Sequence, residues 1–168
     1  MENPQVKQHK DAIILFSHGS LLCGAGENLR RLAAYMQQRG DAEIVEVGYL
    51  NYSEPPFEAS FRRCVAAGAT RITVVPYFLV AGKFVQVDLP PKIEAMRAQY
   101  PQVEVLLAQA MRFHEALADA LIACAHKSAS PAHWRDILNT APQFCRADPR
   151  CPLYGEAPCP AQPKGEPQ

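Results

Sequence analysis

The stretch AIILFSHGS, residues 12–20, decides the fold class of this chain. Residues 12–17 form an apolar run of strand length without alternating polar side chains, which is typical of a strand buried on both faces of a parallel sheet. The next three residues, His-Gly-Ser, end the run and predict a turn. Apolar residues at helical spacing follow over residues 27–39, so the chain opens as strand, turn and helix.

The same alternation continues along the chain. Its short connections favour one α/β domain, a four-stranded parallel sheet flanked by helices. The further predicted elements are a strand at 43–50, a helix from Pro55-Pro56 to Gly68, a strand at 71–80 whose carboxyl end is marked by Pro76, a loop at 81–91, a helix around 93–100, a strand at 103–111 and a helix around 117–124.

The two ends of the chain lack this periodicity. Residues 1–10 are polar and are expected to form a disordered lead, while residues 11–127 hold the α/β domain. Residues 128–168 form a C-terminal extension that is rich in cysteine and proline and is expected to be mostly irregular.

Composition narrows the class of protein. The 17 basic and 17 acidic residues give a net charge of zero, which argues against a nucleic-acid partner. No apolar run approaches the roughly 18 residues that span a membrane, so no membrane partner is expected. No export signal is recognisable, and a reducing cytoplasm is therefore expected. There the six cysteines would not form a disulfide framework.

The candidate site lies at the carboxyl ends of the predicted strands, where open α/β sheets bind ligands. Two of the loops there carry a histidine, His18 and His114. A neutral imidazole accepts a proton or ligates a metal, and His18 either does this or only holds its turn through a backbone carbonyl. Ser20 could cap the following helix or bind a substrate carboxylate. His114 precedes the last helix and could merely cap it.

Four segments resemble those of the sirohydrochlorin chelatases, in the small CbiX/SirB branch of the class II tetrapyrrole metal chelatases. The resemblance covers about residues 11–125. It implies a flavodoxin-like half-lobe that inserts Co²⁺ or Fe²⁺ into a carboxylate-rich tetrapyrrole for cobalamin or siroheme synthesis, and that pairs as a homodimer. The segments are SHGS (17–20), GYLNYSEPPF (48–57), VVPYFLVAGKFVQVDLP (74–90) and MRFHEAL (111–117).

The resemblance implies that His18 is the metal ligand or base. Phe84 occupies the place of the family's second histidine, and a phenyl ring neither ligates a metal nor accepts a proton. Asn51 stands where many relatives carry an acidic residue. Three explanations stay open: His18 suffices alone, His114 or a tail cysteine replaces the missing ligand, or the protein carries a metal or tetrapyrrole without inserting anything.

Further residues are assigned to substrate and cofactor. Lys83, Arg112 and Ser20 are candidates for binding the tetrapyrrole carboxylates, and Phe84 either packs against the macrocycle or fills core space. The tail cysteines are spaced C-x5-C-x7-C, and they either bind an iron–sulfur cluster or Zn²⁺ or are incidental thiols. These are Cys145, Cys151 and Cys159. A dinucleotide-binding protein is disfavoured because no glycine-rich phosphate loop follows the first strand.

Overall fold

The computed structural model describes residues 9–127, 141–155 and 159, and its strands and helices alternate as the sequence predicts. The predictions for residues 1–8, 128–140, 156–158 and 160–168 lie outside this part of the chain. The elements are β1 (Asp11–Ser17), α1 (Glu27–Arg39), β2 (Ile44–Tyr49), α2 (Phe57–Ala66), β3 (Arg71–Pro76), η1 (Phe84–Asp88), α3 (Leu89–Gln99), β4 (Glu104–Leu107), α4 (Glu115–Lys127) and η3 (Ala141–Phe144).

The sheet is parallel throughout and has the strand order β2-β1-β3-β4. This is the flavodoxin-like order, which confirms the predicted fold class. β1 lies in the middle, where Ala12 pairs with Ile44 on one side and with Ile72 on the other. The unbroken apolar run of β1 is explained by this place, because both of its faces are covered.

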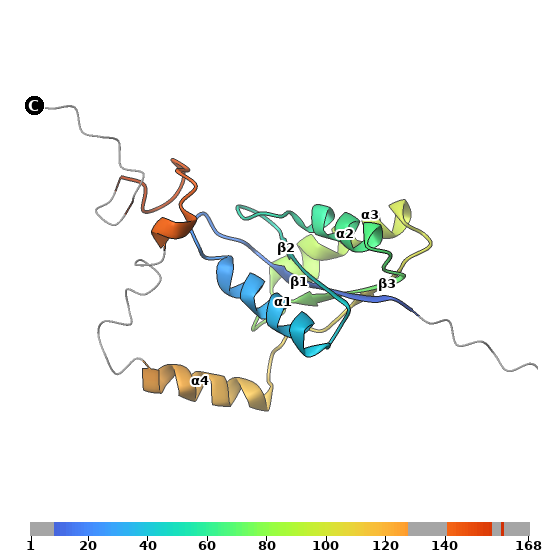
Figure 1. Ribbon diagram of the computed structural model, residues 1–168, viewed down its shortest axis with the longest axis horizontal. Helices are drawn as coiled ribbons and strands as arrows, with labels where there is room; N and C mark the ends of the chain where they lie inside the picture. Colours follow the sequence, from blue (N-terminus) through green and yellow to red (C-terminus); the bar gives the residue numbers. More distant parts are fainter. Residues whose placement is uncertain (1–8, 128–140, 156–158, 160–168) are drawn as a thin grey trace, which may run out of the picture.

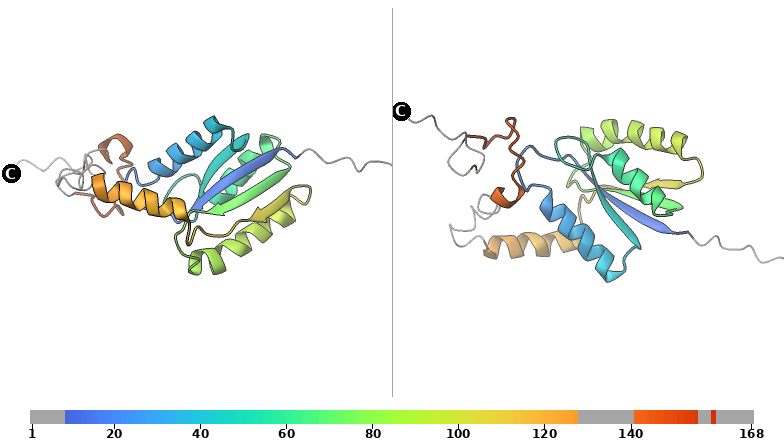
Figure 2. Two further views of the ribbon diagram at one scale, coloured as in Figure 1. Left: turned by 90° about the horizontal axis from the view of Figure 1, so that it is seen from below. Right: turned by 45° about the horizontal axis from the view of Figure 1, so that its top comes forward.

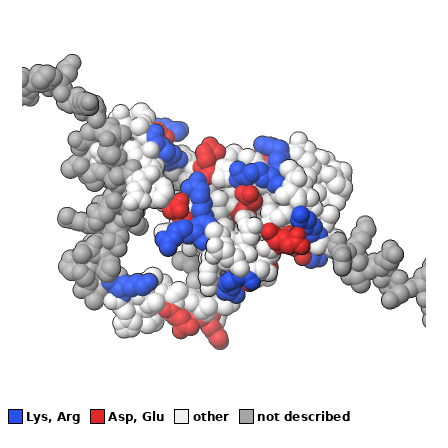
Figure 3. Space-filling view, in the orientation of Figure 1, with Lys and Arg blue, Asp and Glu red and all other residues white. Residues whose placement is uncertain are grey.

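Different helices cover the two faces of the sheet (Figures 1 and 2). On one face, Ile14 and Phe16 of β1 pack in one core with Phe57 and Phe61 of α2 and with residues of α3. On the other face, Leu15 packs with residues of α1. Basic and acidic side chains are interspersed over the face seen in Figure 3, in keeping with the zero net charge.

The last helix departs from the expectation that helices flank the sheet. α4 forms where its apolar spacing predicts it, but it contributes no buried residue and stands apart from the sheet (Figures 1 and 2). Leu121 and Ile122 are 66% and 59% exposed. Among the described helices, none combines the length and the apolar character that a membrane crossing requires.

Three predicted boundaries are corrected. The loop expected over residues 81–91 is largely helical, because Val85 and Leu89 turn into the core and the π-helical turn η1 leads directly into α3. The prolines after Leu89 lie in the first helical turn, where a missing N–H costs nothing. β4 ends at Leu107, short of residue 111. The ordered chain already includes Lys10, whose carbonyl accepts the N–H of Thr70.

Candidate active site

The site begins where β2 and β3 lie on opposite sides of β1, which is the switch point of this sheet. Open α/β sheets bind their ligands outside the carboxyl ends of the strands at such a point. His18 directly follows β1 and is half-buried. Its backbone carbonyl accepts the N–H of Asn51 at 2.9 Å. His18 therefore lies at the carboxyl edge of the sheet, as the sequence predicts.

The imidazole of His18 has one nitrogen engaged. Its Nδ1 lies 3.1 Å from the carbonyl oxygen of Gly19. A carbonyl oxygen only accepts, so this bond places the proton of a neutral ring on Nδ1 and leaves a lone pair on Nε2. The ring thus holds its turn and also keeps one nitrogen that could take a metal or a proton. Holding the turn through a backbone carbonyl therefore does not prevent His18 from binding a metal or a proton.

Two aromatic rings flank this imidazole. The centroid of the Phe84 ring lies 4.4 Å from that of His18, and the Tyr52 ring lies edge-on at 5.6 Å. Phe84 also packs against Phe78 at 6.2 Å, and Phe78 against the core residue Phe16 at 6.0 Å. Phe84 therefore joins the core to the site, which fits the core-packing alternative, while its contact with a macrocycle stays a prediction. Together with Tyr52 it gives His18 an apolar surround.

The turn at His18 requires glycine at the next position. Gly19 has a φ of 85°, in the left-handed region that side chains with a Cβ disfavour. A Cβ built on Gly19 would lie 1.8 Å from the carbonyl oxygen of Asn51. The loop after β1 thus approaches the loop after β2 at a distance that only a residue without a side chain allows.

We expect Gly19→Ala to destabilise the protein more than the matched change Gly40→Ala. Gly40 has a similar φ of 78°, but among the described residues no atom beyond its chain neighbours lies within 4 Å of the position that a Cβ would take there, so that variant should lose only the left-handed preference, about 1–2 kcal/mol. The Gly19 variant adds a backbone clash, and its free energy of unfolding should fall by at least about 1 kcal/mol more. Urea unfolding measures both, and equal losses would contradict the close approach.

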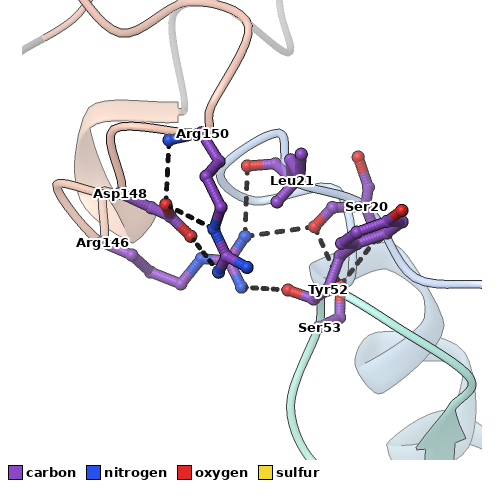
Figure 4. A network of polar contacts seen from close by, with 7 residues as sticks. All are labelled: Ser20, Leu21, Tyr52, Ser53, Arg146, Asp148 and Arg150. Atoms are coloured by element: carbon purple, nitrogen blue, oxygen red, sulfur yellow. Dashed lines mark hydrogen bonds and ion pairs between the residues drawn. The ribbon is translucent and has the colours of Figure 1, made fainter.

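Ser20 ties the two loops together. Its N–H donates to Ser53 Oγ at 3.0 Å, and Ser53 Oγ donates back to its carbonyl at 3.2 Å (Figure 4). The Ser20 hydroxyl accepts the N–H of Leu22 at 3.0 Å. It does not cap α1: that helix has Gly26 at its N-cap and no side-chain capping bond. The helix-capping alternative for Ser20 is therefore wrong.

A small cavity of about 250 Å³ lies behind the His18 loop and is lined by Gly19, Ser20, Tyr49 and Tyr77, among others. The Tyr49 hydroxyl donates to the carbonyl of Gly26 at 3.0 Å, and burial raises its pKa. Pockets that enclose drug-sized ligands measure roughly 300–1,000 Å³. The cavity behind the His18 loop is smaller than such pockets.

The remaining charged candidates are all exposed. Lys83 precedes Phe84 and so shares its loop. Arg112 and His114 border an apolar groove with Leu79 and Leu121, and neither of the rings that contact His18 lines it. The Nδ1 atom of His114 accepts the N–H of Ala116 at 3.2 Å. His114 therefore caps α4, which is the structural alternative considered for it.

The cysteines group differently from the tail site predicted by their spacing. Cys145 and Cys151 pack with Cys23, a residue of the loop after β1, and not with Cys159. Within residues 9–127, 141–155 and 159, no three or more His, Cys, Asp or Glu side chains are arranged to hold a metal. These residues do not fit an iron–sulfur cluster or a structural Zn²⁺, and the predicted cluster is unsupported there. Burial raises the pKa of the core thiol Cys64 to about 12, so that thiol is unreactive.

Two residues near His18 escape sequence reasoning. Tyr52 lies in a loop that the strand-end rule selects, but nothing in the sequence distinguishes its ring from an exposed tyrosine. Arg146 donates to the carbonyls of Ser20, Leu21 and Tyr52, more than ninety residues away in the chain. Such a contact depends on tertiary structure and leaves no local pattern.

The fold and the site define a class: a flavodoxin-like parallel α/β lobe with an imidazole at its switch point. Within that class, the chain belongs to the CbiX family, whose model matches residues 12–127. A sirohydrochlorin ferrochelatase from Priestia megaterium is 31% identical over 114 residues, which are 68% of this chain and 43% of that protein. A sirohydrochlorin cobaltochelatase from Methanopyrus kandleri is 34% identical over 79 residues, 47% of this chain and 55% of that protein.

A solved CbiX protein from Marinobacter aquaeolei VT8 matches with a TM-score of 0.59 and 28% identity. The match covers 70% of this chain and 96% of that one, so the lobe corresponds to nearly the whole of that structure. By contrast, this chain spans about half the length of the curated relatives it matches.

Proposed function

We propose that this protein inserts a divalent metal, Co²⁺ or Fe²⁺, into sirohydrochlorin or a related carboxylate-rich tetrapyrrole, as a step of cobalamin or siroheme synthesis. The observation that carries the proposal is the place of His18 at the switch point of the sheet, with Phe84 and Tyr52 beside it and with no hydrogen bond from the described residues to Nε2. The names of the relatives, a sirohydrochlorin ferrochelatase and a cobaltochelatase, support the reaction class.

Metal insertion requires that the macrocycle release two pyrrole protons and that the metal approach the ring face. The neutral imidazole of His18 can hold the metal through Nε2 or accept a proton there, but not both at once. The flat ring of Phe84 offers the macrocycle an apolar surface beside the metal. In this proposal Phe84 contributes to binding of the organic substrate, and within one chain only His18 contacts the metal.

The tetrapyrrole carboxylates need cationic partners. Lys83 is exposed on the same loop as Phe84, which supports its assignment to one carboxylate. Arg112 is also exposed, on the connection that leads into α4. The Ser20 hydroxyl accepts a backbone N–H through its oxygen and keeps its own O–H as a donor, so Ser20 is proposed to donate to a substrate carboxylate.

A second copy is proposed to complete the cleft. The match covers 43% of one longer relative, the Priestia megaterium ferrochelatase, and the cavity behind His18 is too small to enclose a macrocycle. α4 offers a surface for pairing, because its apolar residues are exposed and a groove runs beside them. Phe113, next to that groove, is 88% exposed. Pairing would bring a second His18 to the cleft and so compensate for the histidine that Phe84 replaces.

We expect the protein in solution to have twice the chain mass of 18.5 kDa, and Leu121→Glu to reduce it to the mass of one chain. Leu121 is an exposed apolar residue of α4, and a carboxylate there would have to be desolvated in an interface. The control is Asp119→Arg, two residues away and so on another side of the helix. Light scattering after size-exclusion chromatography gives the masses, and equal masses for the two variants would contradict this interface.

The second candidate function is a carrier that binds a metal or tetrapyrrole without inserting anything, and the observation that favours it is Phe84 in place of a histidine. Multiple-turnover conditions separate the two. Sirohydrochlorin and Co²⁺ are mixed with a small amount of protein, and the absorbance of the metallated product is followed. The enzyme forms product in excess of protein and faster than the protein-free mixture. A carrier leaves the rate at that background.

A further inference from the structure

The C-terminal segment Ala141–Gly155 lies outside the residues matched by the family model, yet it contacts the active-site loops. We name residues 141–155 the C-terminal strap. Figure 1 shows it against the loop that follows β1, and Figure 4 shows its polar contacts. The strap begins with the short helix η3 and continues in turns.

Arg146 makes the polar attachment. Its Nη1 donates to the carbonyl of Tyr52 at 2.6 Å, and its Nη2 donates to the carbonyls of Ser20 and Leu21 at 3.1 Å each (Figure 4). Ser20 and Leu21 belong to the loop after β1, and Tyr52 to the loop after β2. One guanidinium thus joins the two loops that surround His18. Its planar, fixed donors suit this task, which an ammonium group could perform only in part.

Tyr52 is the residue through which Arg146 reaches His18. Its φ of 61° lies in the left-handed region, which a non-glycine residue occupies only when its surroundings hold it there. Its carbonyl accepts a hydrogen bond from Arg146. The hydroxyl of the next residue, Ser53, accepts the N–H of Ser20 and donates to the carbonyl of Ser20. The Tyr52 ring then lies edge-on to His18. The backbone that carries this ring is thus left-handed, and its carbonyl is bonded to Arg146.

A second, apolar attachment is independent of Arg146. Cys151 is 8% exposed and packs with Cys23, which is 6% exposed, in a cluster that includes Leu22 and Leu153. Phe144 approaches the backbone of Gly24 so closely that a Cβ there would lie 3.2 Å from its ring. The strap therefore buries surface from the loop after β1 as well as bonding to it.

The turn of the strap is held from within. Asp148 accepts hydrogen bonds from the backbone N–H and the guanidinium of Arg150, and the side-chain bond lowers its pKa to about 2. Arg150 has no bond to the active-site loops among the contacts found in the described residues. The two arginines of the strap thus have different partners: Arg146 bonds to the carbonyls around the site, and Arg150 bonds to Asp148 within the strap.

We propose that the C-terminal strap is part of the active site and that Arg146 is a positioning residue, which fixes Tyr52 and the loop after β1 around His18. The catalytic role of the strap rests on the proposed function, but the contacts of the strap with the two loops do not. The strap also borders the cavity beside the site, where Phe144 and Arg146 line a space of about 210 Å³ with Arg30 and Ser53.

The test compares Arg146→Ala with Arg150→Ala in the full chain. Hydrogen exchange is measured for the amides of residues 20–26 and 51–54. Losing bonds from a charged donor should speed their exchange by about tenfold in Arg146→Ala, while Arg150→Ala, which keeps the bonds to these carbonyls and loses only those to Asp148, should speed it less. Cys151→Asp puts a carboxylate into the apolar cluster and so weakens the second attachment of the strap. It should therefore also speed the exchange of residues 20–26. Unchanged exchange in Arg146→Ala overturns the proposal whether or not the protein inserts metal.

The positioning role has its own measurement, which needs no insertion. The Kd for sirohydrochlorin, from its change in fluorescence, should rise about tenfold in Arg146→Ala, be intermediate in Arg146→Lys, and rise less in Arg150→Ala than in Arg146→Ala. Faster exchange with an unchanged Kd would reduce the strap to a structural role and overturn the positioning claim. If the wild-type protein bound the macrocycle without turnover, the enzyme proposal would be wrong, while the positioning role of Arg146 would be unaffected.

Discussion

Replacing His18 with alanine is expected to lower kcat/KM for Co²⁺ insertion into sirohydrochlorin by at least about a hundredfold. The change removes the nitrogen, Nε2, that is left free when Nδ1 bonds the Gly19 carbonyl. The described residues offer no group of three or more potential ligands that could take over. Initial rates from the absorbance of the metallated product, over a range of macrocycle concentrations, give the value.

The matched control is His114→Asn. His114 accepts a backbone N–H at the start of α4, and the asparagine side chain can accept the same bond, so the helix cap is retained while the imidazole is lost. Its kcat/KM should remain near that of the wild type. Thermal unfolding of both variants checks that neither loss comes from the fold. If the two variants lost activity equally, His18 would hold no special role.

Replacing Phe84 with histidine is expected to strengthen Co²⁺ binding by about a hundredfold, because a second ligand on the same scaffold binds at a high effective concentration. The Phe84 ring lies 4.4 Å from the His18 ring, a distance at which two imidazoles can share one metal. Competition with a coloured chelator measures the affinity. The ring of Phe84 packs against the ring of Phe78, so an imidazole at position 84 should occupy the same place.

Phe84→Leu serves as the control for that gain, since it removes the ring and adds no ligand. Its Co²⁺ affinity should stay at the wild-type value, while its affinity for the macrocycle falls with the loss of the flat apolar surface. If the histidine variant bound Co²⁺ no more tightly than the leucine variant, the two side chains would not face a common metal position. The role proposed for Phe84 would then be wrong.

Much of the fold could be predicted because its signals are local. The apolar run of β1 and the stops at Gly40 and Pro76 all fall where the structure has them. The helical turn η1 is predicted to be part of a loop, although the sequence carries a signal for it: the apolar residues Val85 and Leu89 are one helical turn apart. Both are buried in the structure. The prolines at the start of α3 conceal the signal, because proline looks like a breaker unless it is recognised as occupying a first turn.

The surroundings of α4 could not be predicted, because the spacing of Leu117 and Leu121 shows that a helix forms but not what covers it. The same applies to the site. His18 follows from the rule for strand ends, and the loop of Phe84 from the resemblance. The bonds of Arg146 to Ser20 and Tyr52 join distant segments. Cys23 joins Cys145 and Cys151 for the same reason, and counting the spacings in the tail points to Cys159 instead.

The claim that His18 meets the metal through Nε2 is tested most directly by NMR of protein labelled at the histidine nitrogens, with paramagnetic Co²⁺ added in the absence of tetrapyrrole. The predicted result is that the ring signals of His18 broaden first, with Nε2 affected more than Nδ1, while those of His114 persist. Sharp His18 signals at Co²⁺ concentrations that broaden another histidine would contradict the assignment of the site.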